Sequence, residues 1–189
     1  INDNAVQVTD TPTDNYAVMN PLNTVLPSSN GNLTCTKATA GWASSSGTIA
    51  STSGKYYYEA SMSTIGGANY IALGLVFTEA TAYLSQYAGQ NTNSWSVLTN
   101  SVDLATYFNA IPTNPTTITA TPSMKFQVAV DIDEGKLWLG YDNNWLGGGS
   151  PSTATSPTYT FTANSSVTPM VSGNVNTINV NFGQKDFAY

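Results

Sequence analysis

Three carboxylates between residues 131 and 134 are the side chains best placed for acid–base chemistry. On one strand, Asp131 and Asp133 would point to the same face about 7 Å apart, a separation that suits a pair of glycosidase carboxylates. With Glu134 they also suggest a calcium loop, but the following Gly135 and Lys136 supply a cation where calcium needs more oxygen ligands. Acidic residues also favour β-turns, where they form local hydrogen bonds. We therefore rank a structural turn first, a metal site second and a catalytic pair last.

The absence of histidine removes most other catalytic arrangements. A Ser-His-Asp triad, a Cys-His pair and a histidine-ligated zinc ion all need an imidazole. Cys35 is the single cysteine, so it has no base to activate it and no disulfide partner within the chain, and we expect a small buried apolar residue. The glycines at 147–149 lack the Gly-Lys-Ser/Thr ending and the helix of a phosphate-binding loop. The sequence thus predicts no catalytic residue, no metal and no cofactor.

Aromatic residues stand beside amide side chains in two segments, residues 83–95 and 143–145. Such neighbours suit the recognition of a sugar or a peptide, because a ring stacks while an amide forms directional hydrogen bonds. A loop tryptophan also commonly folds back to close the end of a β-sandwich, and that alternative stays open. Trp138 is expected in the core or on a sheet face, and Trp42 either covers the core or lies on the surface. The predicted binding residues are Tyr83, Tyr87, Asn93, Trp95, Asn143, Asn144 and Trp145.

The charge of the chain excludes several classes of partner. Only 8% of the 189 residues are charged, the net charge is −6, and the basic residues are five scattered lysines without arginine. Nucleic acid and anionic lipid both need clustered basic side chains, so neither is expected to bind. No apolar run approaches the ~20 residues of a membrane-spanning helix, so no membrane insertion is expected. The lack of histidine also predicts a fold and binding that change little between about pH 5 and 8.

These side chains must be positioned by β-strands. Apolar residues alternate along 128–132 and 137–141, and the Glu-Gly dipeptide at 134–135 suits a hairpin turn between them. Asn30-Gly31 is a second hairpin signal, and prolines exclude a long helix from residues 1–30. Residues 78–122 are the least regular part, with at most one short helical turn after Glu79. Further strands are expected at 54–62, 70–77, 158–162, 167–172 and 176–183, so the sequence predicts a single all-β sandwich domain.

Four segments resemble, in the same order, the motifs of the SPRY (B30.2-like) family. They are residues 54–59 (G-K-Y-Y-Y-E), 71–76 (I-A-L-G-L-V), 128–140 (V-A-V-D-I-D-E-G-K-L-W-L-G) and 180–189 (V-N-F-G-Q-K-D-F-A-Y). The sequence departs from the family pattern at Ser123, Met124 and Gln127, where Gly-Asp and Gly are usual, and at Asp186, where proline is common. These departures affect loops rather than strands, so the resemblance still predicts the fold.

The resemblance implies a bent antiparallel β-sandwich, related in architecture to concanavalin-like jelly rolls. Residues 1–53 would form an extended or β leader packed on a SPRY-like sandwich of residues 54–189, in one structural domain. SPRY domains are binding modules without known catalysis, and they use loops at one edge of the sandwich. Residues 10–21 with 31–33, and residues 144–151, also resemble SPRY modules of tailed-phage virion proteins, which implies a place on a fibre or as capsid decoration.

The expected function is therefore a non-enzymatic module on the surface of a phage particle that presents loops for host-surface recognition, to a glycan or a protein. Copies of itself or other virion proteins are the expected partners, and the virion surface or the extracellular space is the expected location. The alternative is a self-assembling architectural subunit of a virion or an extracellular filament, which the low charge favours because few charges must be desolvated. A glycoside-active enzyme ranks last, since it depends on Asp131 and Asp133 alone.

Overall fold

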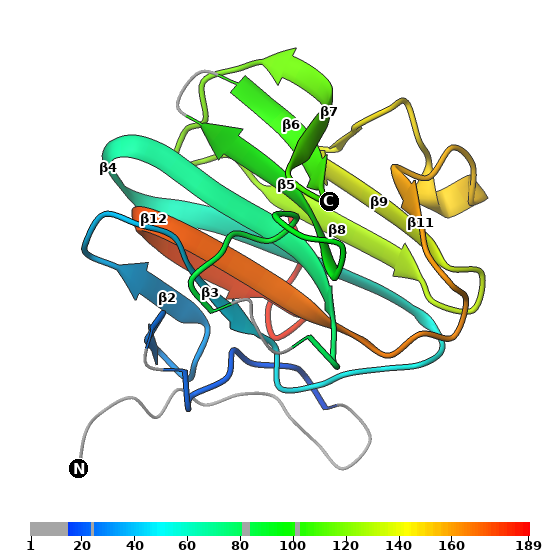
Figure 1. Cartoon of the computed structure of the whole chain (residues 1–189), viewed down its shortest axis with the longest axis horizontal. Coiled ribbons are helices and arrows are strands. Elements are labelled where there is room, and N and C mark those ends of the chain that lie inside the picture. The colour runs from blue at the N-terminus through cyan, green and yellow to red at the C-terminus, as the bar shows by residue number, and fades with distance from the viewer. Residues whose placement is uncertain (1–14, 24, 81–83, 101–102) are drawn as a thin grey trace.

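The protein folds into two antiparallel β-layers packed face to face (Figure 1). The computed structural model describes residues 15–23, 25–80, 84–100 and 103–189. Within these ranges the helical structure is the 3-10 helix η1 (Pro151–Thr153), and no helix there is long and apolar enough to cross a membrane. The strands are β1 (Ser28–Ser29), β2 (Thr34–Lys37), β3 (Ala43–Ser46), β4 (Lys55–Phe77), β5 (Ser94–Asn100), β6 (Asp103–Phe108), β7 (Ile111–Thr117), β8 (Phe126–Asp131), β9 (Lys136–Tyr141), β10 (Asn144–Trp145), β11 (Tyr159–Thr160) and β12 (Val167–Asn181).

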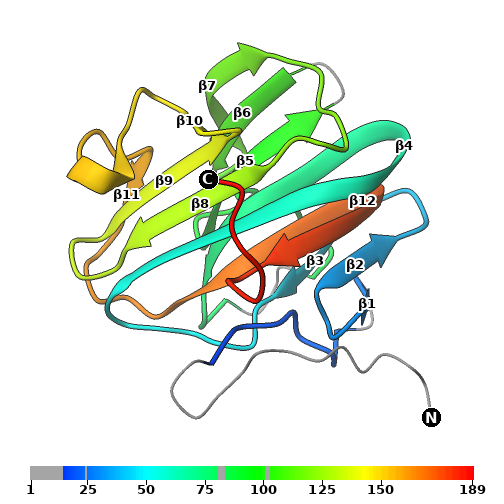
Figure 2. The same ribbon diagram turned by 180° about the vertical axis from the view of Figure 1, so that it is seen from behind.

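Two long strands, β4 and β12, belong to both layers. They pair antiparallel from Phe77 with Val167 at one end to Glu59 with Asn181 at the other. Both strands fold back at the left of Figure 1 and the right of Figure 2, so each passes there from one layer into the other. The register of β12 shifts at Val175, whose φ of +57° leaves strand geometry at this bend. The predicted bent antiparallel sandwich is therefore confirmed.

Each layer is built from one half of each long strand. The first layer contains β1, β2, the second half of β12, the first half of β4, β8 and β9, with β10 and β11 paired to β9. The second layer contains β3, the other halves of β12 and β4, and the meander β5–β6–β7. The predicted leader supplies β1–β3, and both β2 and β3 hydrogen-bond to β12. The described part of the leader is thus an integral part of the sandwich.

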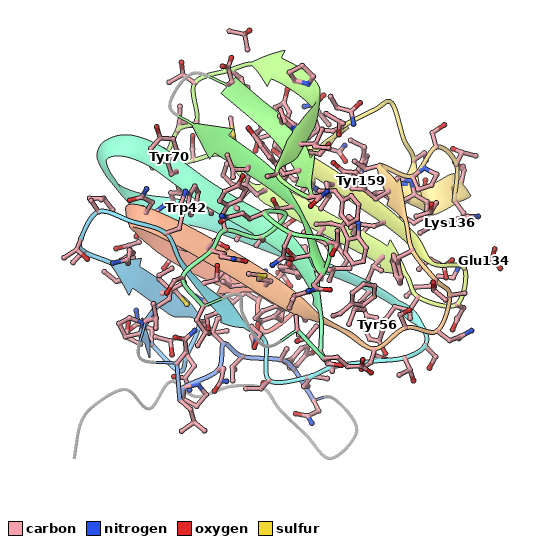
Figure 3. The ribbon with its side chains drawn as sticks, in the orientation of Figure 1. Trp42, Tyr56, Tyr70, Glu134, Lys136 and Tyr159 are labelled. Carbon is pink, nitrogen blue, oxygen red and sulfur yellow. The ribbon has the colours of Figure 1, made fainter. Side chains whose placement is uncertain are left out.

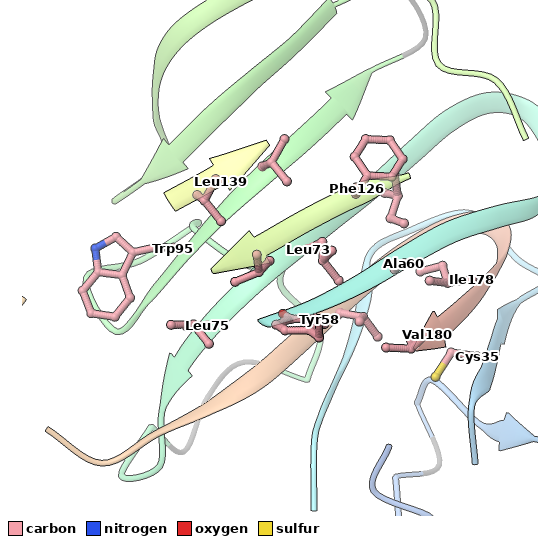
Figure 4. Packing of buried hydrophobic residues seen from close by; sticks show 14 of the residues in the cluster. Cys35, Tyr58, Ala60, Leu73, Leu75, Trp95, Phe126, Leu139, Ile178 and Val180 are labelled. Atoms are coloured by element: carbon pink, nitrogen blue, oxygen red, sulfur yellow. The ribbon is translucent and has the colours of Figure 1, made fainter. Parts of the chain in front are cut away.

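The core lies between the layers, as the close-up in Figure 4 shows. Alternation places Val128 and Val130 of β8, and Leu137 and Leu139 of β9, on its first-layer side, as the period of two predicts. The Tyr58 hydroxyl crosses this core and donates a hydrogen bond to the carbonyl oxygen of Gly74. The second layer contributes Ile71, Leu73, Leu75, Trp95, Val97 and Leu104. Full burial of each large apolar side chain contributes about 1.5–3 kcal/mol, so this layer of contacts dominates the stability of the fold.

Cys35 is the small buried apolar residue that the sequence predicts. Its side chain is fully buried in the same core cluster, and it pairs through its backbone with Ile178 of β12. Burial raises the pKa of the Cys35 thiol to about 12, because a thiolate would lose its hydration there. The thiol therefore stays protonated at neutral pH and does not act as a nucleophile.

The strand boundaries differ from the sequence prediction in three places. The hairpin over 128–141 is confirmed, but its loop has four residues, 132–135, between the paired Asp131 and Lys136. The separate strands predicted at 54–62 and 70–77 form the single β4, and those at 167–172 and 176–183 form β12. Pairing between β4 and β12 on both sides of the bend, from Tyr70 with Asn174 to Ile65 with Asn176, joins the two halves of each strand. The predicted strand at 158–162 is reduced to the two residues of β11.

The prediction that residues 78–122 are the least regular part of the chain, with at most one short helical turn, misses the strands β5, β6 and β7. Their serines, threonines and asparagines hide the apolar alternation, and pairing of β5 with the second half of β4 creates the meander. Of the short helical turn predicted after Glu79, residues 81–83 lie outside the described residues. Tertiary pairing has overridden a weak local signal here.

Candidate functional site

The outer face of the first layer carries polar and aromatic side chains that alternate with core residues. Along β4, Tyr58 and Ala60 enter the core, so the intervening Tyr57 and Glu59 lie on the opposite face. On the neighbouring strand β8, Gln127 is the register partner of Glu59. This alternation brings three polar groups from two strands to one part of the outer face.

These groups form a hydrogen-bonded chain that reaches the loop after β9. The Gln127 side-chain nitrogen donates to the Tyr57 hydroxyl at 2.6 Å, and that hydroxyl donates to Glu59 Oε1 at 2.6 Å. The backbone N–H of Asn143 donates to the Gln127 side-chain oxygen at 2.6 Å. Burial is the main cause that raises the pKa of Tyr57 above its ordinary value, so its hydroxyl stays a donor. The chain of bonds fixes the loop at Asn143 against the sheet.

The C-terminal residues cross this face, as the red segment over β8 and β4 shows in Figure 2. The Asn181 side-chain nitrogen donates to the backbone oxygen of Lys185 at 3.1 Å. The carboxylate of Glu59 accepts the backbone N–H groups of Ala188 at 3.0 Å and Tyr189 at 3.2 Å. Glu59 is only 3% exposed, and a buried carboxylate is tolerated where such donors replace water. The tail and the strand therefore hold each other in place.

Tyr57 is the centre of an aromatic group on this face. Its ring packs edge-on against Phe187 of the tail, with centroids 4.8 Å apart, and against Trp145 of β10, with centroids 6.4 Å apart. Trp145 is half-buried, while Asn143 and Asn144 beside it are exposed. We call Tyr57, Asn143, Asn144, Trp145 and Phe187 the Trp145 surface. It combines aromatic faces with amide groups on a rigid sheet, which suits stacking and directional hydrogen bonding to a ligand.

A hollow of about 310 Å³ adjoins the Trp145 surface. Trp138 and Trp145 form part of its wall, and Lys55 and Asp131 lie among its lining residues. The Trp138 indole N–H donates to the backbone oxygen of Thr155 at 2.8 Å, so the loop after β10 holds this ring. Trp138 is buried on the sheet face, which is one of the two positions that its strand pattern allows. The hollow extends the aromatic surface along the sheet.

The three carboxylates of the β8–β9 hairpin are engaged in its structure. Asp131 is buried, accepts the Glu134 backbone N–H at 3.1 Å and pairs with the Lys55 ammonium at 2.6 Å. Asp133 accepts the backbone N–H of Gly54 at 2.9 Å. The prediction of a structural turn is confirmed by these bonds. Among the residues that the structure describes, no group of three histidine, cysteine or acidic side chains could hold a metal ion.

We expect the melting temperature to stay constant between about pH 5 and 8, and to fall below about pH 4. The hydrogen bond from Lys55 is the main cause that lowers the pKa of Asp131 below its ordinary value of 3.8. The stability from this carboxylate is thus present above pH 3.8 and lost as the pH falls through the lowered value. The same bond raises the pKa of Lys55 above 10.5, so its contribution is lost only at strongly alkaline pH.

Calorimetry of the chain and of Asp131→Asn from pH 2 to 9 checks this expectation. The variant should have a lower melting temperature at pH 7 and a weaker dependence on pH between 2 and 4, because it lacks the titrating group. A transition near pH 6 in either protein would contradict the assignment, since no histidine exists to produce it.

The predicted binding residues are not brought to one site. Asn143, in the turn after β9, lies together with Asn144 and Trp145, which form β10. Asn93 is exposed in the turn before β5, and Tyr87 is half-buried on the outer face of the second layer. Tyr83 lies outside the described residues. The prediction therefore divides between the two outer faces of the sandwich.

Tyr87 belongs to a second aromatic group, which covers the outer face of the second layer. Its ring lies 5.1 Å from Trp42 and 5.8 Å from Tyr107, and Trp42 lies 5.8 Å from Tyr70 (centroid distances). Figure 3 labels Trp42 and Tyr70 beside the bend of β4 and β12. All four rings are half-buried, and those of Trp42, Tyr87 and Tyr107 pack against the small outer cluster of apolar residues that includes Leu98. Trp42 thus covers apolar residues and also reaches the surface.

The assignment of Trp95 to a binding surface is wrong. Its side chain is only 4% exposed and belongs to the core cluster. Its ring is stacked on Phe108, with an interplanar angle of 9° and centroids 5.7 Å apart, and packs edge-on against Phe77 at 4.9 Å. Trp95 and Val97 are two positions apart on β5, so both side chains point to the same face and enter the core. A partner cannot reach this ring without unfolding the strand.

Tyr57 and Phe187 of the Trp145 surface, and the buried Glu59 that supports it, are not among the residues predicted from the sequence. The period of two along β4 is a local signal for Tyr57 and Glu59, because they alternate in the sequence with Tyr58 and Ala60, which enter the core. No local signal places Phe187 against Tyr57, because 130 positions separate them and the contact forms only when the tail crosses the sheet.

The fold is similar to that of solved SPRY domains. The SPRY domain of human HERC1 superposes with a TM-score of 0.66 at 13% identity, covering 89% of this chain and 99% of that one. The PSpry domain of TRIM65 superposes with a TM-score of 0.62 at 14% identity, covering 88% of this chain and 92% of that one. Another human SPRY domain superposes with a TM-score of 0.56 at 14% identity, covering 82% of this chain and 94% of that one. No family model and no curated protein matches the sequence. The predicted SPRY fold is confirmed, and at these identities the likeness concerns the fold alone.

Proposed function

We propose that this SPRY-fold chain is a non-enzymatic binding module that contacts a host-surface glycan or protein through the Trp145 surface. The observation that carries the proposal is the juxtaposition of Trp145, Tyr57 and Phe187 with the exposed amides of Asn143 and Asn144. Rings supply contact area with little loss of side-chain entropy, and amides supply directional bonds. The hydrogen bond from the Asn143 backbone N–H to the Gln127 side chain holds this loop before any ligand arrives, which lowers the cost of binding.

The proposed location is the surface of a tailed-phage particle, on a fibre or as capsid decoration. It depends on the resemblance of residues 10–21 and 144–151 to SPRY modules of phage virions, and the second of these segments includes Trp145. The composition supports an exposed location, because polarity is carried by uncharged side chains and only 8% of residues are charged. Localisation of the chain in purified particles by immunogold microscopy tests this part of the proposal.

Trp145→Ala is expected to weaken binding to the host surface at least tenfold, about 1.4 kcal/mol, because a central aromatic anchor is lost. Binding is measured on a glycan array and, in parallel, on isolated host envelopes, so that a glycan and a protein receptor are distinguished. The matched control is Trp42→Ala, which removes a half-buried tryptophan from the other layer. Unchanged binding by the Trp145 variant, with loss in the Trp42 variant, would assign recognition to the second aromatic group instead.

The alternative function is a self-assembling architectural subunit. The low charge favours close packing of copies, but the outer strand of the second layer opposes assembly through strand pairing. This strand, β7, carries Pro112 and Pro115, which cannot donate hydrogen bonds to a neighbouring strand. Sedimentation of the isolated chain tests the alternative: filaments or large oligomers without any host ligand would favour it over recognition.

Glycoside hydrolysis ranks last because the hairpin carboxylates already have partners. Asp131 is paired with Lys55, and Asp133 is bonded to the backbone of Gly54. Cleavage of host polysaccharide that is abolished by Asp133→Asn, with folding intact, would reverse this ranking.

A further inference from the structure

A small apolar pocket opens at the end of the sandwich opposite the bend of β4 and β12. Its volume is about 130 Å³. Its walls come from the starts and ends of the two long strands, from the β8–β9 hairpin, from residues 15–17 and from the segment that holds Ile49 and Ser51. Figure 3 labels Tyr56 at this end of the molecule. We call it the end pocket. Its depth lies on the core side of β4, whereas the Trp145 surface lies on the outer side, and Tyr57 contributes to both.

The end pocket is apolar in its depth and open at its rim. Tyr58, Leu75 and Val167 belong to the buried core and line it, as do Val130 and Ile132 of the hairpin. Two of the exposed large hydrophobic side chains of the described chain stand among its lining residues: Ile49 is 37% exposed and Tyr56 is 51% exposed. A charged ligand would lose its hydration against such walls, so the pocket suits an uncharged apolar group.

The Tyr56 hydroxyl offers a hydrogen-bond acceptor at the mouth of the pocket. The Ser51 hydroxyl donates its single proton to the backbone oxygen of Ser53 at 2.7 Å. The 3.1 Å bond between the Ser51 and Tyr56 hydroxyls must then have Tyr56 as its donor. The Tyr56 oxygen therefore keeps a lone pair beside the apolar depth of the pocket. A ligand with a hydroxyl group on an apolar ring could donate to it.

We propose that the end pocket binds a single phenol-type ring, with the ring in the apolar depth and its hydroxyl donating to Tyr56. The volume supports the size, because a dry apolar cavity of about 150 Å³ is known to take benzene. The apolar core side chains that line the depth suit an aromatic ring. The lone pair of the Tyr56 oxygen suits a hydroxyl group on that ring. This inference goes beyond the proposed function and does not depend on it. Tyr57 contributes to both sites, but the depth of the end pocket is formed by core residues and its acceptor by Tyr56, none of which belongs to the Trp145 surface.

The test is a titration of the methyl-labelled chain with p-cresol, with toluene and with N-acetyl-tyrosinamide, followed by NMR. Saturable shifts are expected in the methyl groups of Leu75, Val130, Ile132 and Val167. p-Cresol should bind several-fold more tightly than toluene, and Tyr56→Phe should remove that preference while leaving the fold intact. Binding of p-cresol alone would assign a free small phenol, and binding of the tyrosine amide as well would assign a tyrosine side chain of a partner.

Ile49→Trp should fill the mouth and weaken p-cresol binding at least tenfold, because the larger ring occupies the entrance. Ile49 lies outside the strands, so the fold should survive, and thermal unfolding checks this. Ile111→Trp is the matched control, since Ile111 is an exposed isoleucine on β7 that does not line the pocket. Shifts that fail to saturate, that spread over exposed apolar residues, or that respond equally to the two tryptophan variants would overturn the proposal.

Discussion

Trp95→Ala is expected to lower the free energy of unfolding by about 3–5 kcal/mol, because it removes the largest aromatic contact in the core. The ring is 4% exposed and packs against three phenylalanines from three parts of the chain. Phe77 ends β4, Phe108 ends β6, and Phe161 follows β11. Alanine would leave a cavity that rigid strands cannot close, so the loss includes the cavity as well as the transfer of the ring.

Urea denaturation followed by circular dichroism measures this change, because the other tryptophans complicate a fluorescence signal. Trp145→Ala is the control, since that ring is half-buried on the short strand β10 and its loss should cost about 1 kcal/mol or less. A loss of under about 1.5 kcal/mol at Trp95 would show that the ring is outside the core. The comparison also separates folding from recognition, which the two tryptophans would otherwise confuse in a binding assay.

Gly74→Ala is expected to destabilise the fold by at least about 3 kcal/mol, or to prevent folding, because a side chain has no room there. Gly74 lies in β4 between Met170 of β12 and Ser96 of β5. A Cβ atom at this position would come within 1.7 Å of the Trp95 carbonyl oxygen and 2.8 Å of the Ser96 Cα. Both are backbone atoms, so relief requires β5 to move away from β4 and break its pairing.

The yield of folded protein and its urea midpoint measure the effect at Gly74. Gly148→Ala is the control: Gly148 has a φ of +71° and nothing within 4 Å of an added Cβ, so it should cost about 1 kcal/mol from backbone conformation alone. The double variant Gly74→Ala with Trp95→Ala should be no more stable than the single Gly74 variant, because the clash is with the backbone. Rescue in the double variant would mean that the indole ring, and not the strand, causes the clash.

The sequence predicts the first-layer hairpin well because its information is local. Val128 and Val130 face Leu137 and Leu139 with a strict period of two, and such a pattern survives in any sheet that buries one face. The second layer was harder to predict. In β5, serines and threonines alternate with Trp95 and Val97, and several of these polar side chains are themselves buried. The composition of the segment is therefore typical of a loop.

The candidate site was predicted in part for the same reason. Trp95 and Trp145 both follow asparagine-rich stretches, and composition does not distinguish a strand residue from a turn residue. Pairing with β4 turns Trp95 inward, whereas the short β10 leaves Trp145 at the surface. The register of one strand against another decides which face a side chain occupies, and a shift of one residue reverses it.

The sequence by itself determined the all-β class, the hairpin at 128–141 and the role of Asp131 and Asp133 as turn residues. The alternation of apolar residues and the preference of acidic residues and glycine for turns act between near neighbours, so both can be recognised in the sequence. The tertiary structure alone decided which aromatic rings reach the surface and what surrounds the buried Glu59. Those contacts join β4 to a tail about 130 positions away, and they arise only when the bend and the strand register are set.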